Sequence, residues 1–195
     1  MQSTTLSKSQ IEKLGNTLIY LSENVGDFGK TKALKLLFLL EQKSIKNLGV
    51  PFFGFDFKVW QFGPVVEEVF NDLSDVENSL LRSYIKRASW NPDEFVAIAN
   101  FNDDEFSIND IELMSDIAKF AKHKTAKDLV GITHGKNSLW LKAVEENNLS
   151  EKFAKKDITK TNISIDFSSI LEDDYLKERY ENALDYLELS NHLKS

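Results

Sequence analysis

The fold is decided by the stretch Lys35-Leu36-Leu37-Phe38-Leu39-Leu40, which is followed, after Gly49-Val50-Pro51, by Val59-Trp60-Gln61-Phe62-Gly63-Pro64-Val65. The first block belongs to a segment whose apolar residues cover most of a helix circumference, which is typical of a helix at the centre of a fold. Residues 52–62 instead alternate with a period of two, which predicts a strand. We expect a turn at Gly63-Pro64, with Pro64 at the first position of the next helix, where its missing N–H does no harm.

A further block lies downstream, where Thr133-His134 is followed by Trp140. The blocks together resemble the Panacea domain, a SocA-like antitoxin family that is also labelled phage-associated. Its pattern has Lys-Leu-Leu-Tyr in a helix, then Gly-x-Pro, then Ala-Trp-x-Tyr-Gly-Pro-Val, and later Thr-His with a Trp beyond it. Phe38, Val59 and Phe62 stand where the family usually has Tyr, Ala and Tyr. Each keeps an apolar or aromatic side chain, so the fold assignment is unaffected.

The resemblance implies an antitoxin that binds and neutralises a toxin, with no catalytic residue and no cofactor of its own. Its partner would be a cognate toxin encoded by a neighbouring gene. It also implies an adaptor mode, in which the complex delivers the toxin to a Clp-type protease. The family motif residues, which are structural or toxin-binding under this interpretation, are Lys35, Leu36, Leu37, Trp60, Phe62, Gly63, Pro64, Val65, Thr133, His134 and Trp140.

Composition is that of one ordinary globular domain: 195 residues, 42% hydrophobic and 28% charged. No run approaches the roughly 18 apolar residues of a spanning helix, and the start Met1-Gln2-Ser3-Thr4-Thr5 lacks the features of a secretory signal. We therefore expect a cytoplasmic protein without a membrane partner. Cysteine is absent, which excludes disulfides, thiolate chemistry and a Cys-based zinc site, and we predict no metal site.

Periodicity predicts a mostly α fold with a small antiparallel β element. We expect a compact helical domain over residues 1–146, and a linker with an acidic C-terminal helix over residues 147–195. A β-hairpin is predicted from residues 82–88 and 95–101, which flank the turn signal Asn91-Pro92-Asp93. Capping-box spacing predicts helices that begin near Ile108 and Ala126.

The C-terminal end carries most of the net charge. The chain as a whole has a charge of −7, of which residues 166–195 contribute −5. An acidic surface suits a basic partner and repels nucleic acid, so Glu181 and Asp185 are candidates for partner contact. A solvated helix face is an equally good interpretation. As a further alternative, Ile163, Ile165 and Phe167 form an edge strand that pairs with a strand of the partner.

His134 invites a catalytic interpretation, because histidine titrates near neutrality. The sequence favours a structural role instead, in which Thr133 and His134 bond exposed backbone groups at a helix junction. An enzyme that uses His134 is thus a minor alternative. Trp60, Phe62 and Trp140 fit either the core or a toxin interface. In a two-residue period Trp60 and Phe62 lie on the face opposite Phe55 and Phe57, so one set faces the domain interior and the other a partner or the hairpin. For Trp60 and Phe62 the core is the favoured position.

A DNA-binding regulator, phage-borne or acting on its own operon, is the main alternative function. Residues 108–121 and 126–132 form two helices joined by a short turn, as in a helix-turn-helix, with Lys119, Lys122, Lys124 and Lys127 nearby. The second helix has no Arg, Asn or Gln suited to reading base edges. An antitoxin therefore remains the preferred interpretation.

Overall fold

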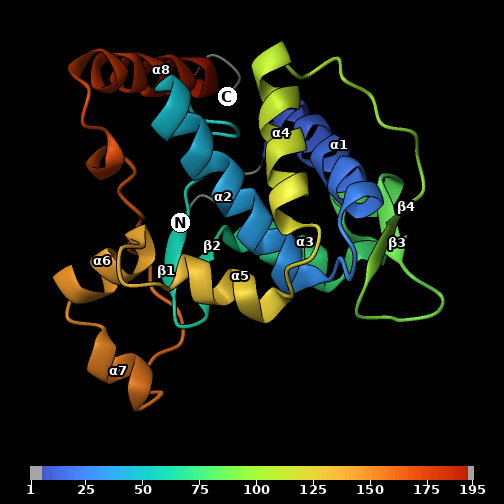
Figure 1. Cartoon of the computed structure of the whole chain (residues 1–195), viewed down its shortest axis with the longest axis horizontal. Helices are drawn as coiled ribbons and strands as arrows, with labels where there is room; N and C mark the ends of the chain where they lie inside the picture. The colour runs from blue at the N-terminus through green and yellow to red at the C-terminus, as the bar shows by residue number, and fades with distance from the viewer. Residues whose placement is uncertain (1–5, 193–195) are drawn as a thin grey trace.

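Helix α2, Lys30–Leu48, lies at the centre of the computed structural model, which describes residues 6–192 (Figure 1). It contacts α3, α4, α5, α8 and strand β2. Leu36, Leu37 and Phe38 are buried on it, as are Leu34 and Leu40. The central helix that the sequence predicts is therefore confirmed.

The other elements surround α2. In chain order they are α1 (Lys8–Asn24), β1 (Lys58–Trp60), β2 (Gly63–Val65), α3 (Glu67–Ser74), the 3-10 helices η1 (Val76–Asn78) and η2 (Leu80–Ser83), β3 (Ile85–Arg87), β4 (Phe95–Ala97), α4 (Ile108–Ala121), α5 (Ala126–Thr133), α6 (Leu139–Glu146), α7 (Ser150–Ala154), η3 (Ser168–Ile170) and α8 (Asp174–His192).

Two helices begin where the sequence predicts. Ser107 and Asp110 form a capping box at the start of α4, and Thr125 and Asp128 form another at the start of α5. In each box the hydroxyl of the N-cap residue accepts a hydrogen bond from the main-chain N–H of the aspartate, which has no partner within the helix. The carboxylate of the aspartate accepts from the main-chain N–H of the N-cap residue. Local side chains thus define both helix starts.

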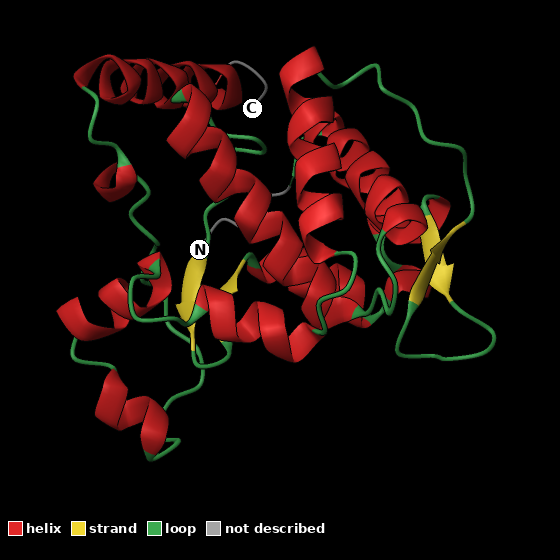
Figure 2. Cartoon of the chain, in the orientation of Figure 1, coloured by secondary structure: helices red, strands yellow, loops and turns green. Residues whose placement is uncertain are grey.

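The β structure consists of two small antiparallel sheets at different places in a mostly helical body (Figure 2). The predicted hairpin is β3–β4, in which Ile85 pairs with Ala97 and Arg87 pairs with Phe95. The second sheet is β1–β2, in which Trp60 pairs with Gly63. The predicted class, mostly α with a small antiparallel β element, is confirmed.

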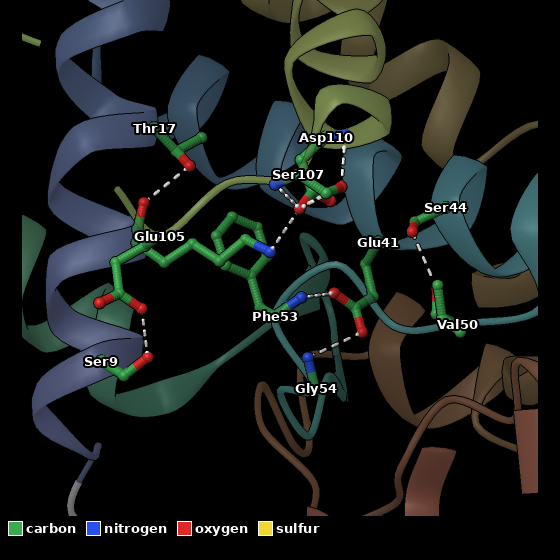
Figure 3. A network of polar contacts seen from close by, with 11 residues as sticks. Ser9, Thr17, Glu41, Ser44, Val50, Phe53, Gly54, Glu105, Ser107 and Asp110 are labelled. Atoms are coloured by element: carbon green, nitrogen blue, oxygen red, sulfur yellow. Dashed lines mark hydrogen bonds and ion pairs between the residues drawn. The ribbon is translucent and has the colours of Figure 1, made fainter. Parts of the chain in front are cut away.

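The strand predicted over residues 52–62 is mostly absent, because β1 covers only Lys58–Trp60. The N–H groups of Phe53 and Gly54 donate instead to the buried carboxylate of Glu41, at 2.7 and 3.2 Å (Figure 3). Gly54 also has a φ of +70°, which interrupts an extended chain. A side chain on α2, rather than a neighbouring strand, satisfies this backbone.

Pro64 is not the first residue of a helix, contrary to the prediction. It lies in β2 opposite Val59, and α3 begins three residues later at Glu67. Gln61 and Phe62 form the turn between the two strands, so the chain reverses before it reaches Pro64. A proline without an N–H is tolerated at the edge of such a small sheet.

The segment between residues 147 and 189 packs on the domain. The segment for which the sequence predicts a linker contains α7, whose Phe153 is buried. The Val59 N–H donates to the Ile163 carbonyl and the Ile165 N–H donates to the Phe57 carbonyl, at 2.8 and 2.7 Å. The segment around Ile163 and Ile165 therefore pairs with β1 of its own chain rather than with a partner.

Candidate functional site

The three sequence blocks of the family motif meet at the turn between β1 and β2. Lys35 on α2 donates from Nζ to the Phe62 carbonyl at 2.7 Å, and Trp140 on α6 donates from Nε1 to the Trp60 carbonyl at 2.8 Å. Both acceptors belong to the main chain on either side of Gln61. Side chains from two helices therefore hold the turn in place.

Gly63 is required at the centre of this arrangement. Its φ is +110°, a conformation that L side chains rarely adopt. A Cβ at this position would meet Lys35 Nζ, and it would lie 2.5 Å from His134 Nε2. The space that a side chain would need is thus already occupied by the two nitrogen atoms.

His134 follows α5 directly, as its C-cap residue. Its ring stacks on the Trp140 indole, with ring centroids 4.0 Å apart and planes 12° apart. Nε2 is buried and has no hydrogen-bond partner among residues 6–192. Burial, followed by the positive charge of Lys35, lowers the pKa of His134 to about 4, although the Phe62 carbonyl opposes this shift. The imidazole is therefore neutral at physiological pH.

Thr133, beside His134, is buried and bonds within its own helix. Its hydroxyl donates to the carbonyls of Leu129 and Val130, at 3.0 and 3.3 Å. The pair Thr133-His134 thus lies at a helix end, where carbonyl groups lack helical N–H partners. This position fits the structural role that the sequence favours.

Lys35 is almost fully buried, and burial lowers its pKa to about 8. The expectation of an apolar central helix left out two further buried charged residues of α2, Lys32 and Glu41. Lys32 donates to the Gly26 carbonyl, and burial raises the pKa of Glu41 to about 7. In the sequence, the signal for these buried charges is that charged residues interrupt a segment whose other positions are apolar and suit a core.

Trp60 and Phe62 do not both lie in the core, contrary to the expectation from the sequence. Trp60 is 6% exposed and Trp140 is 8% exposed, whereas Phe62 is 72% exposed. The two-residue period ends at Trp60, because Phe62 is part of the turn. Gln61 anchors this turn further, since its main-chain N–H donates to the Thr159 carbonyl and its side-chain Nε2 donates to the Phe153 carbonyl. Phe62 therefore projects into solvent from a fixed backbone.

The remaining candidate residues lie apart from this turn or beneath it. Leu36 and Leu37 are in the hydrophobic core, and Pro64 and Val65 are buried in β2. Glu181 and Asp185 are exposed on α8, which crosses the C-terminal end of α2, whereas Lys35 lies in the N-terminal half of that helix (Figure 1). The acidic pair and the turn are thus two separate surfaces.

The structure gives little support to DNA binding, metal binding or membrane insertion. α4 and α5 are present, and Lys119, Lys122 and Lys127 are exposed, but α5 packs on α2 and β2. The described part of the chain contains no group of three or more His, Cys, Asp or Glu side chains placed to hold a metal ion. Within residues 6–192, no helix has the length and apolar character needed to cross a membrane.

The sequence matches the model of a known protein family. The family model described as "Antitoxin SocA-like, Panacea domain" matches residues 34–141, which is more than half of the chain. The matched region includes the turn and all the residues whose side chains hold it: Lys35, Gln61 and Trp140. No curated protein and no solved structure matches the chain.

Proposed function

Because the chain belongs to the SocA-like antitoxin family with a Panacea domain, we propose that it is an antitoxin that neutralises a toxin protein by direct binding. The toxin is the product of a neighbouring gene. The antitoxin acts as a stoichiometric binder and carries out no reaction of its own. The surroundings of His134 support a non-catalytic role for this residue. Its Nε2 is buried near Lys35, and its ring is stacked on Trp140.

The observation that carries the proposal is the exposure of Phe62 on a backbone that Lys35, Trp140 and Gln61 hold in place. Aromatic side chains contribute a large share of the binding energy at protein interfaces. A side chain on a preorganised backbone loses little conformational freedom on binding, so more of its contact energy appears as affinity. We therefore assign Phe62 as an anchor of the toxin interface.

A co-expression assay tests the proposal. The neighbouring gene is expressed alone and together with this chain, and the two products are then co-purified. Growth arrest that this chain relieves through a stable complex is the expected result. Absence of toxicity, or relief without a complex, contradicts the proposal; a titration with DNA of its own promoter then tests the regulator alternative.

The role of Phe62 is tested by substitution in the same complex. Phe62→Ala should weaken toxin binding by roughly ten-fold or more, as truncation of an interface anchor does. Trp90→Ala is the matched control, because Trp90 is 71% exposed and lies in the loop between β3 and β4. Equal affinities for the two variants would remove Phe62 from the interface and leave the antitoxin role intact.

The adaptor mode is distinguished by toxin turnover. If the complex delivers the toxin to a Clp-type protease, toxin half-life in cells should shorten when this chain is present and recover when the protease is deleted. A toxin level that does not depend on the protease identifies simple neutralisation by binding.

A further inference from the structure

The C-terminal helix α8 has one side that is fixed to the domain. Tyr180 is buried, and the Leu176 carbonyl lies 2.7 Å from the place where a Cβ of Gly49 would be. Leu187 Cδ1 lies 2.6 Å from the corresponding position at Gly54. The two glycines, both with positive φ, thus allow the helix to approach closely. This contact determines which side of α8 faces solvent.

A different side of α8 carries an exposed apolar stripe. Tyr175, Tyr186 and Leu189 are 68%, 72% and 63% exposed. At 3.6 residues per turn, spacings of eleven and three residues place the three side chains within about 60° of one another around the helix axis, so they share one side of α8. Single exposed apolar residues are ordinary, but three on one side of a helix form an apolar face that a partner protein can cover.

Three carboxylates border one edge of this stripe, whereas a single exposed cation, Arg179, borders the other edge one turn after Tyr175, so the face is acidic on balance. Glu178 lies one turn after Tyr175, Asp185 adjoins Tyr186, and Glu181 lies between them; all three are exposed. None of the three forms an ion pair or a side-chain hydrogen bond with the side chains that the structure describes, those of residues 6–189. Their charge is therefore available to a partner.

The charge selects the kind of partner. A second copy of the same face would bring carboxylates against carboxylates, and nucleic acid or an anionic membrane would be repelled in the same way. A helix with anchors at these spacings fits an apolar groove on a protein. We infer that the outer face of α8, formed by Tyr175, Glu178, Glu181, Asp185, Tyr186 and Leu189, docks into an apolar groove of the toxin that is bordered by Lys and Arg residues. This inference rests on the proposed antitoxin function.

Two independent variants of the full chain test it in the purified toxin complex. Tyr186→Ala with Leu189→Ala removes two anchors, and we expect a loss of affinity of roughly ten-fold or more. Glu181→Lys with Asp185→Lys reverses two charges, and we expect slower association and a smaller dependence of affinity on salt concentration. Circular dichroism should show the same helix content as the parent protein in both variants, because the altered side chains are exposed.

Each variant has a matched control. Trp90→Ala removes a similarly exposed aromatic ring from another surface, and Glu112→Lys with Glu145→Lys makes the same change in net charge on α4 and α6. Both controls should bind like the parent protein.

If a complex forms and neutralises the toxin but the α8 variants match their controls, the inference is wrong and the antitoxin role stands. If no complex forms, the proposed function fails and the inference fails with it. A change of oligomeric state without a change in toxin affinity assigns the face to self-association and also overturns the inference.

Discussion

The indole N–H of Trp140 donates to the main-chain carbonyl of Trp60, which lies 80 residues earlier in the chain, at 2.8 Å. Both groups are buried, and no element of secondary structure contains both residues. The bond joins α6 to the strand that precedes the Phe62 turn. A tryptophan that is part of the family motif thus binds the backbone of another part of the motif, two residues before the exposed Phe62.

Trp140→Phe should lower the free energy of unfolding by about 1–3 kcal/mol, because it leaves the buried Trp60 carbonyl without its donor while it keeps an aromatic ring. Urea denaturation followed by circular dichroism measures this change. The exposed substitution Trp90→Phe should shift stability by less than about 0.5 kcal/mol. Equal stability of the two variants would show that the bond contributes nothing.

Gly63→Ala should destabilise the protein by about 2 kcal/mol or more, because alanine is strained at a φ of +110° and its methyl group would overlap Lys35 and His134. Toxin binding should weaken as well, since the neighbouring Phe62 would move. Gly131→Ala is the control. A Cβ there meets nothing within 4 Å, and alanine favours the helix α5. If Gly63→Ala had the same free energy of unfolding as the parent protein, the turn backbone would have to accommodate a methyl group by moving.

Glu41→Gln should remove a pH dependence of stability in the range from about 4.5 to 7. The folded-state pKa of Glu41 is raised to about 7 from 4.5, so the folded protein binds more protons in this range and its stability falls as pH rises. A shift of this size corresponds to about 3 kcal/mol. Unfolding free energies of parent and variant, measured from pH 4.5 to 7.5, should therefore converge or cross as pH rises. A constant difference would contradict burial of an ionisable carboxyl here, and the exposed Glu112→Gln should leave the profile unchanged.

His134→Gln should have the opposite effect on the pH profile. The folded-state pKa of His134 is lowered to about 4 from 6.5, so the unfolded chain binds more protons between these values and stability falls on acidification. The variant should lose that acid sensitivity relative to the parent protein. Because Glu41 acts in the opposite sense over much of the same range, only the difference between parent and variant profiles reports on His134. His123→Gln, at an exposed position, is the control.

Local sequence signals are sufficient to predict the central helix, the β3–β4 hairpin and the starts of α4 and α5. Each of these follows from local information: apolar periodicity for α2, turn residues around Asn91 for the hairpin, and capping boxes at Ser107 and Thr125. The order of the motif blocks was likewise sufficient to identify the family. The helices and the hairpin depend on side chains within a few residues of one another, and the motif depends only on the order of short blocks, so all are visible without a tertiary structure.

The conformation of the residues between Phe52 and Val65 depends instead on tertiary contacts. The Glu41 carboxylate binds the N–H groups of Phe53 and Gly54 and replaces a strand partner, while Lys35 and Trp140 hold the turn that exposes Phe62 and buries Trp60. These bonds join residues that are distant in sequence, and no local pattern encodes their geometry. The same is true of α8: its amphipathic sequence predicted a helix, but only its contact with Gly49 and Gly54 established that Tyr175, Tyr186 and Leu189 face solvent.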